Sequence, residues 1–321
     1  MSEHQFILEP YKTPSSRYTC PLCGRKRNFS RYIDVETNRH IADHVGRCNR
    51  EQNCGYHYTP RQYFNDNATN SFRGTRSIIF TKPLSLKPSS TISMELIIKS
   101  LNRIENNHFI TYLNTLFDDK TVNDLIDHYK IGTSKYWKGA VVFWQIDHTW
   151  KVKAGKVMLY DPESGCRMKK PYNHISWVHS ILKIADYNLQ QCFFGEHLLD
   201  LYPERPISIV ESEKTAIIAS VYFPEFIWIA TGGKHGCKWT SHEVWKVLKS
   251  RKVVLWPDLN AFQDWEKKAE LLKKQGLNIA ISNLLEDFST EDERASGLDI
   301  ADYLIRFPYK QNWKEYYSRG P

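Results

Sequence analysis

The sequence contains no long apolar run. No stretch reaches the ~18 uninterrupted apolar residues of a membrane-spanning helix, and the start, MSEHQFILEP, lacks the basic and apolar regions of a secretory signal. It also lacks an internal repeat of fixed period and any low-complexity segment. These absences argue against a helical membrane protein and a solenoid, and they predict a cytoplasmic protein without a membrane partner.

Acidic residues are fewer than basic ones. The 321 residues include 36 Asp and Glu against 44 Lys and Arg, which gives a formal net charge of +8. The excess is clustered, with ten basic against four acidic residues in 130–190 and six against one in 234–252. Clustered cations release counterions from phosphates, so we expect a polyanionic partner; the alternative is a soluble protein that happens to be basic.

Cysteine is also scarce, yet four of the seven cysteines share a spacing pattern. Cys20 and Cys23 form C-x2-C, and Cys48 and Cys54 follow after 24 residues as C-x5-C. Two such pairs converge on one tetrahedral Zn²⁺, and the glycine after Cys23 lets backbone amides point at the thiolates. His57 is an alternative fourth ligand, and scattered core cysteines are the competing interpretation. Four protein ligands leave no open position, so we predict a structural zinc site.

Cations and aromatic rings alternate directly after the first cysteine pair. Phosphates would meet the cations of such a segment while bases stack on its rings, which suits a single strand. The alternative is a solvated basic turn with its rings in a small core. The residues concerned are Arg25, Lys26, Arg27, Phe29, Arg31 and Tyr32.

The chain is long enough for about two units, and its pattern changes four times. We expect a zinc ribbon at 1–64, a Pro- and Ser-rich linker at 65–93, a helical and then β basic subdomain at 94–204, and an α/β domain at 205–321. Helices are predicted between residues 94 and 129, followed by strands at 139–145 and 151–160, the second half-exposed. From residue 206 strands alternate with helices, which indicates a mostly parallel sheet.

Two carboxylates follow strands of that sheet. Glu211 ends the strand ISIVE, and Asp258 comes directly after VVLWP. Ligands bind at the carboxyl ends of parallel strands, and Mg²⁺ or Mn²⁺ prefers oxygen ligands. Each residue alone could be an ordinary helix N-cap.

Three motifs resemble, in order and spacing, the toprim domain of primases and topoisomerases. They are V-E-S-E-K-T-A at 210–216, T-G-G-K at 231–234 and L-W-P-D-L-N at 255–260. The resemblance implies that Glu211, Lys214, Asp258 and Asn260 form the catalytic set. The family's third motif reads D-x-D, so Asn260 replaces a charged ligand and weakens the attraction for a divalent ion.

Another acid could compensate for Asn260. Glu213, Asp264 and Asp299 are the candidates, and we add Asp299 to the predicted magnesium ligands beside Glu211 and Asp258. Asp299 lies in G-L-D-I-A-D-Y-L, which resembles the end of many phage and mobile-element primases; an ordinary helix N-cap is the alternative.

The region before residue 205 resembles the basic subdomain that precedes toprim in bacterial-type primases. Y-K-I-G at 129–132, two strands and R-M-K-K-P-Y-N at 167–173 carry this resemblance, which implies that Lys169 and Lys170 lead a single-stranded template, with Lys234 a further contact. A basic surface loop is the alternative. Zinc ribbon, basic subdomain and toprim occur in the family's own order.

The resemblance implies a DNA primase-type nucleotidyltransferase that makes short primers from nucleoside triphosphates on single-stranded DNA, in replication of a chromosome, phage or mobile element. No G-x-x-x-x-G-K-[ST] occurs, so any helicase partner is separate. The first alternative is a degenerate toprim protein that only binds nucleic acid, which Asn260 supports. The second is a toprim nuclease. Cys166, Cys192 and Cys237 are expected to be buried thiols.

Overall fold

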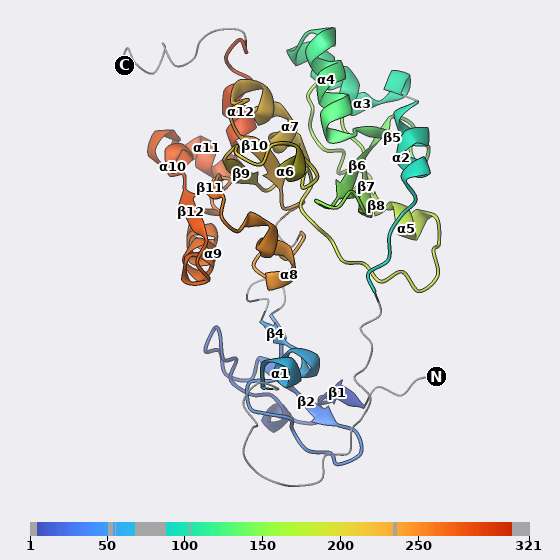
Figure 1. The fold of residues 1–321 in the computed structure, drawn as a ribbon. Helices are drawn as coiled ribbons and strands as arrows, with labels where there is room; N and C mark the ends of the chain where they lie inside the picture. Colours follow the sequence, from blue (N-terminus) through green and yellow to red (C-terminus); the bar gives the residue numbers. More distant parts are fainter. Residues whose placement is uncertain are drawn as a thin grey trace. The chain divides into compact units, whose positions relative to one another are not determined.

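The chain divides into two compact units, residues 1–84 and 85–321 (Figure 1). The computed structural model describes residues 5–50, 54, 56–67, 88–102, 104–233 and 236–309. Within these ranges no helix has the length and apolar character to cross a bilayer. Most of the predicted linker, residues 68–87, lies outside the described residues, and the predicted boundary at 204/205 falls inside the second unit and stays a prediction.

The first unit is a small antiparallel sheet. It comprises β1 (Phe6–Leu8), β2 (Phe29–Asp34), β3 (Gly46–Cys48) and β4 (His57–Tyr58), paired in that order, with the short 3-10 helix η1 (Pro14–Ser16) and the helix α1 (Pro60–Asn67). Gly46 has no space for a side chain, because a Cβ there would lie 2.2 Å from the backbone oxygen of Ser30. The buried centre consists of Phe29, Cys20 and Cys48, so the cysteines organise this unit, as predicted.

The second unit opens with the predicted helices. These are α2 (Met94–Leu101), the 3-10 helix η2 (Ile104–Asn106), α3 (His108–Leu116) and α4 (Asp119–Tyr129). The side chains of Ser93, Asn107 and Asp118 accept backbone N–H groups at the three α-helix starts, as capping residues do.

An antiparallel sheet follows, in the order β5 (Gly132–Ser134), β6 (Ala140–Ile146), β7 (Val152–Met158) and β8 (Ile175–Trp177). Alternate residues of β6 belong to different cores: Phe143 packs into the larger cluster with α3, and Trp144 packs with residues of α2 and α5 (Val178–Ile181). Both predicted strands are confirmed. The predicted half-exposure of β7 was wrong, because α2 and α5 cover the second face of the sheet.

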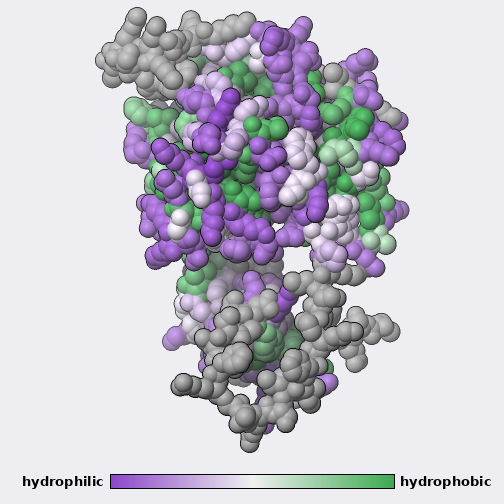
Figure 2. Space-filling view, viewed as in Figure 1, coloured by the Kyte–Doolittle hydropathy of each residue, from purple (hydrophilic) through white to green (hydrophobic). Residues whose placement is uncertain are grey.

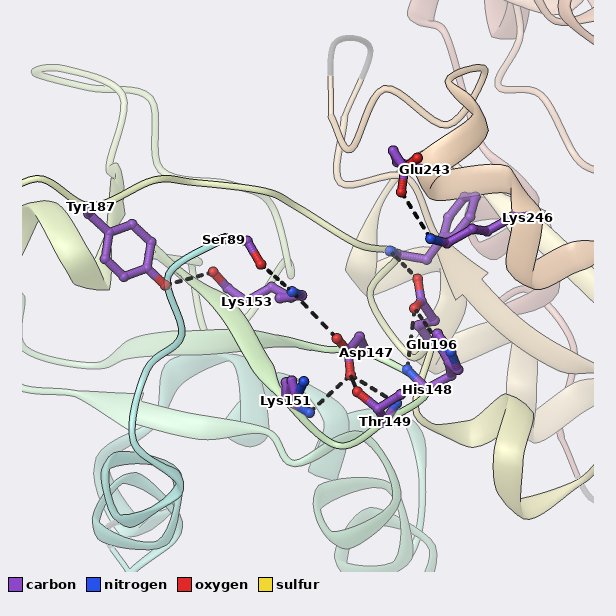
Figure 3. A network of polar contacts seen from close by, with 11 residues as sticks. Ser89, Asp147, His148, Thr149, Lys151, Lys153, Tyr187, Glu196, Glu243 and Lys246 are labelled. Carbon is purple, nitrogen blue, oxygen red and sulfur yellow. Dashed lines mark hydrogen bonds and ion pairs between the residues drawn. The ribbon is translucent and has the colours of Figure 1, made fainter. Parts of the chain in front are cut away.

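The turn between β6 and β7 holds a polar network (Figure 3). One carboxylate oxygen of Asp147 accepts the N–H groups of Thr149 and Lys151 at 2.9 and 3.0 Å. Its other oxygen lies 3.6 Å from the ammonium of Lys153, which also donates to Ser89 at 2.7 Å. The network therefore ties the segment before α2 to the end of the antiparallel sheet.

The predicted strand and helix alternation produces a parallel sheet in the order β10-β9-β11-β12. After α6 (Leu198–Leu201), the chain runs through β9 (Ile207–Val210), α7 (Glu213–Tyr222), β10 (Ile227–Ala230), α8 (His242–Trp245), η3 (Lys246–Leu248), β11 (Lys252–Leu255), α9 (Phe262–Lys274) and β12 (Asn278–Ile281). It ends with α10 (Leu284–Phe288), α11 (Glu291–Ser296) and α12 (Ile300–Leu304). The chain leaves β9 toward β10 on one side and returns to β11 on the other, so the strand order reverses between β9 and β11. Ligands of open α/β sheets bind at such a switch point.

One large core joins α3, α4, one face of the antiparallel sheet and the parallel sheet. The hydroxyl of Tyr129, at the end of α4, donates to the backbone oxygen of Trp228 in β10 at 3.1 Å. In the view of Figure 2, hydrophilic residues cover most of the displayed face of this unit, with small hydrophobic areas between them. The two sheets therefore form one packed body, and the end of β9 lies within it.

Candidate functional site

The four predicted cysteine ligands come together in the first unit. The sulfur atoms of Cys20, Cys23, Cys48 and Cys54 all lie within 4.8 Å of one another, and those of Cys20 and Cys54 are 3.6 Å apart. A tetrahedral zinc ion with bonds of ~2.3 Å separates its sulfur ligands by about 3.8 Å, whereas a disulfide needs ~2.05 Å. All four are free thiols. The spacing fits a zinc ion and excludes a disulfide in this conformation.

The chain around Cys23 prepares its sulfur for a metal. Gly24 takes φ +65°, and the Arg25 backbone N–H, hydrogen-bonded to the sulfur, lowers the pKa of Cys23 to about 7. A thiolate is the form that binds metal. The alternative ligand His57 is not required, because its ring nitrogen is 2.8 Å from the hydroxyl of Tyr32 and the four cysteines complete a tetrahedral set.

The basic segment after the cysteine pair is split between two environments. Arg25, Lys26 and Arg27 are exposed. Arg31 instead forms an ion pair with Asp43 at 2.8 Å and lies over the ring of Tyr18. The ring of Phe29 is fully buried, so the small-core interpretation holds for that residue. Three of the four predicted cations thus face solvent.

The acidic residues gather at the carboxyl edge of the parallel sheet. Glu211 follows β9, and Asp258 lies three residues after β11, so both stand at the switch point. The backbone oxygen of Glu211 accepts the N–H groups of Gly232 and Gly233 at 3.0 and 2.9 Å. The loop after β10 therefore holds Glu211 in place.

The carboxyl group of Asp258 is strongly perturbed. Burial, followed by the charges of Asp299 and Glu211, raises the pKa of Asp258 to about 8. Its Oδ1 atom is buried without a hydrogen-bond partner among the described residues. A carboxylate in this position is repelled by its neighbours and unsatisfied, which is the situation that a bound cation relieves.

Asp299 joins the same group from the start of α12. Its Oδ1 atom caps that helix, and its Oδ2 atom accepts the hydroxyl of Thr215 from α7 at 2.5 Å. Burial and the neighbouring charge of Asp302 raise the pKa of Asp299. Lys214 lies 3.6 Å from Asp302. Burial opposes its charge, but Asp299 and Asp302 outweigh burial and raise the pKa of Lys214. The N-cap alternative is confirmed for Asp299, and its role as a magnesium ligand stays a prediction.

Asp302 belongs to this acidic group but was not predicted from the sequence. It lies three residues after Asp299, one helical turn along α12, and that spacing was the available signal. The other two compensating candidates lie elsewhere: Asp264 is paired with Lys268 at 2.6 Å on α9, and Glu213 is paired with Lys156 at 3.0 Å.

Asn260 contacts α11, and its predicted catalytic role stays a prediction. It has φ +71°, is exposed, and its side-chain amide donates to the backbone oxygen of Arg294. Asn tolerates this left-handed backbone better than most residues. Its amide group therefore binds the loop after β11 to α11.

The acidic group is looser than the cysteine group. Within the described part of the chain, only the cysteines place three or more ligand atoms within 4.8 Å of one another. Mg²⁺ usually keeps several of its waters and binds through one or two carboxylates. The residues present therefore fit a hydrated cation held by Asp258 with Glu211 or Asp299, and not a closed protein cage.

Lys169 and Lys170 lie beside a row of aromatic rings at one end of the antiparallel sheet. Both lysines are exposed in the loop before β8. The ring of Tyr172 stacks on His174 at 4.4 Å, and the loop before β6 adds Trp137, 5.1 Å from His174. Tyr136, Lys135 and Lys138 of that second loop are exposed as well. We call these eight residues the aromatic-basic cluster; Lys234, the remaining predicted contact, lies outside the described residues.

Cys166 is exposed, contrary to expectation, whereas Cys192 and Cys237 are buried as predicted. The loop that carries Cys166 is pressed against the ring of Tyr112, where a Cβ on Gly165 would lie 2.3 Å from ring atoms. Glu163, Ser164 and Arg167 are exposed as well, so Cys166 lies in a surface turn.

Two families match parts of the chain. Residues 4–69 match a family described as a zinc beta-ribbon finger, and residues 107–259 match a domain of unknown function (DUF6371). No curated protein matches the chain. The N-terminal region is thus a zinc-ribbon region attached to a mixed α/β unit.

Solved structures similar to this chain include three primases. The primase fragment of the bacteriophage T7 primase-helicase has 12% identity and a TM-score of 0.37, covering 88% of this chain and 98% of its own. The RNA polymerase domain of Mycobacterium tuberculosis primase DnaG has 9% identity and a TM-score of 0.40, covering 68% and 81%. The zinc-binding and RNA polymerase domains of Aquifex aeolicus primase have 13% identity and a TM-score of 0.36, covering 98% and 85%. These values are low, and no residue role is transferred from them.

Proposed function

We propose that this protein is a primase-type nucleotidyltransferase with a toprim-like metal site, acting on single-stranded DNA. The observation that carries the proposal is the convergence of Glu211, Asp258 and Asp299 at the switch point, with Asp258 buried and unsatisfied among the described residues. Three acids gathered against mutual repulsion are a poor way to stabilise a fold, and they suit a site for Mg²⁺ or Mn²⁺.

The roles of the residues follow from their positions. Asp258, with Glu211 or Asp299, would hold the cation, which neutralises a triphosphate and helps to activate the attacking 3′-oxygen. Lys214 balances the acids through Asp302. In the transfer, the 3′-oxygen bonds to the α-phosphorus and pyrophosphate leaves. The chain's contribution is to fix the acids and to place the strand.

Two surfaces are proposed to hold the strand and its phosphates. In the first unit these are Arg25, Lys26 and Arg27 beside the zinc site. In the second unit the aromatic-basic cluster combines exposed cations with rings, as non-specific single-strand sites do. Lys169 and Lys170 belong to this cluster, and a separate helicase partner remains a proposal from the motif resemblance.

Primer synthesis with and without Glu211→Gln tests the proposal. The zinc-loaded parent should extend or start primers on single-stranded templates with Mg²⁺ or Mn²⁺, and Glu211→Gln should lose at least about 100-fold of this activity, as is typical when charge stabilisation of the transition state is removed. Asp264→Asn, an exposed acid of α9, is the matched control. A parent with full zinc content that makes no primer on any template contradicts the proposal.

Asn260 favours a second candidate, a protein that binds nucleic acid without chemistry. Its amide is committed to Arg294, so the third motif supplies one acid instead of two. Under this alternative, Asp258→Ala would leave replication of the host element and strand binding unchanged. A nuclease, the further alternative, would release cleaved products under the same metal conditions and is distinguished in the same assay.

A further inference from the structure

A lysine from the antiparallel sheet contacts two segments that follow Glu211 in the chain, the start of α7 and the loop after β10. Lys156 lies on β7, and its ammonium nitrogen is 3.0 and 3.1 Å from the two carboxylate oxygens of Glu213. The same nitrogen is 2.9 Å from the backbone oxygen of Gly232. An ammonium group has three donors, and each finds an acceptor here. We call Lys156, Glu213 and Gly232 the Lys156 bracket.

The bracket is almost completely buried. Lys156 is 7% exposed and Glu213 is 1% exposed. Taking two charges out of water is so unfavourable that apolar residues of similar volume often stabilise a fold equally well or better. Stability alone therefore does not explain the pair, and its geometric effect matters more.

The ion pair holds the two segments that position Glu211. Glu213 is the first residue of α7, two positions after Glu211. Gly232 and Gly233 donate their N–H groups to the backbone oxygen of Glu211 at 3.0 and 2.9 Å. Lys156 thus contacts the start of α7, which follows Glu211. It also contacts the loop whose N–H groups bind the backbone oxygen of Glu211.

Gly232 is matched to this arrangement. It takes φ +84°, and a Cβ there would lie 3.3 Å from a carboxylate oxygen of Glu213 and 3.4 Å from the amide nitrogen of Gln145. A side chain would therefore strain the backbone and crowd the ion pair.

We propose that Lys156 is a positioning residue for the acidic site: by joining Glu213 to Gly232, it fixes the backbone of Glu211 and thereby the direction in which its carboxylate faces Asp258. This inference rests on the proposed metal-binding function of that site. Lys156 touches neither substrate nor metal in this role and acts through Glu211.

The experiment compares the parent with Lys156→Met and with the double variant Lys156→Met/Glu213→Met. The single variant leaves the Glu213 carboxylate buried without its partner, which destabilises the fold, whereas the double variant removes both charges together and keeps the side-chain volume. In the zinc-loaded double variant we expect Mn²⁺, measured by electron paramagnetic resonance without nucleotide or DNA, to bind about 10- to 100-fold more weakly, as is typical when residues that support metal ligands are changed.

Lys153→Met is the matched control. Lys153 lies on the same strand, three residues before Lys156, and its side chain is 13% exposed. It pairs with Asp147 at 3.6 Å instead of with the bracket (Figure 3). This variant should keep the Mn²⁺ affinity of the parent. If Lys153→Met and the double variant lose Mn²⁺ affinity equally, any change on β7 weakens the metal site. That result would overturn the positioning role of Lys156.

Hydrogen exchange at the Gly232 and Gly233 amides provides a readout that needs no metal. Both amides should be protected in the parent and in Lys153→Met, and they should exchange faster in the double variant. Unchanged protection in a folded double variant overturns the proposal. A parent that binds no Mn²⁺ refutes the proposed function of the acidic site, and the exchange measurement still decides whether Lys156 positions Glu211.

Discussion

Replacing Asp258 by Asn should stabilise the second unit when divalent cations are absent. The carboxyl group of Asp258 is buried, has an unsatisfied oxygen among the described residues, and faces Asp299 and Glu211, so its pKa is raised from 3.8 to about 8. The folded state then binds a proton that the unfolded chain releases near pH 4. Stability from this group is complete below pH 4 and is lost as the pH rises toward 8.

The size of the effect follows from the slope of this linkage. One group changes the free energy of unfolding by at most about 1.4 kcal/mol per pH unit. Between pH 5 and pH 7 the free energy of unfolding of the parent should therefore fall by up to about 3 kcal/mol relative to that of Asp258→Asn. Saturating Mg²⁺, at 100 times its Kd, should return about 2.7 kcal/mol to the parent.

Tryptophan fluorescence makes this measurement specific to one unit. All ten tryptophans lie in residues 85–321, so urea unfolding followed by fluorescence reports the second unit alone. Asp264→Asn, which removes an exposed carboxylate paired with Lys268, should show no such gain. The free energy of unfolding of the parent and of Asp258→Asn is compared from pH 5 to 8 in divalent-free buffer. The same pH dependence in both would refute the inference that Asp258 is a buried carboxyl group repelled by its neighbours.

Three further predictions concern the zinc site and the aromatic-basic cluster. Cys20→Ser should abolish binding of one Zn²⁺ per chain, measured by metal analysis, and should unfold the first unit, while the tryptophan-detected transition of the second unit stays unchanged. Tyr136→Ala/Tyr172→Ala should weaken binding of oligothymidylate by about 5- to 150-fold per stacked base without weakening an abasic oligomer of equal length, measured by anisotropy without divalent cations. Lys169→Ala/Lys170→Ala should instead weaken both oligomers and make the salt slope shallower by about 1.4.

Local patterns in the sequence predicted the parts of the fold that depend on neighbours in the chain. The Cys20 and Cys23 spacing defines a knuckle by itself, and alternating strands and helices imply a parallel sheet whose carboxyl ends share one edge. The sequence therefore predicts that Glu211 and Asp258 share that edge. Their grouping into a magnesium site stays a prediction, because the carboxylates do not form a closed cage among the described residues.

Features that depend on distant segments could not be predicted in this way. Lys156 and Glu213 are separated by 57 positions, and neither has a neighbour that signals the pair. The burial of all residues of β7 except Lys153 depends on α2 and α5, which come before and after it in the chain.

Asn260 makes a structural contact that the charged aspartate of the third motif could not make. The residue occupies a left-handed backbone position, and its side chain must donate a hydrogen bond to the backbone oxygen of Arg294. An aspartate fits that backbone but presents only acceptors at neutral pH, so it would face the carbonyl oxygen without a donor. The amide at 260 is therefore required by the contact with α11, and the charge that the third motif lacks has to come from another element. Asp299, on the segment that directly follows α11, brings a carboxylate into electrostatic range of Asp258, and the loop contact and the acid thus arrive from the same stretch of chain.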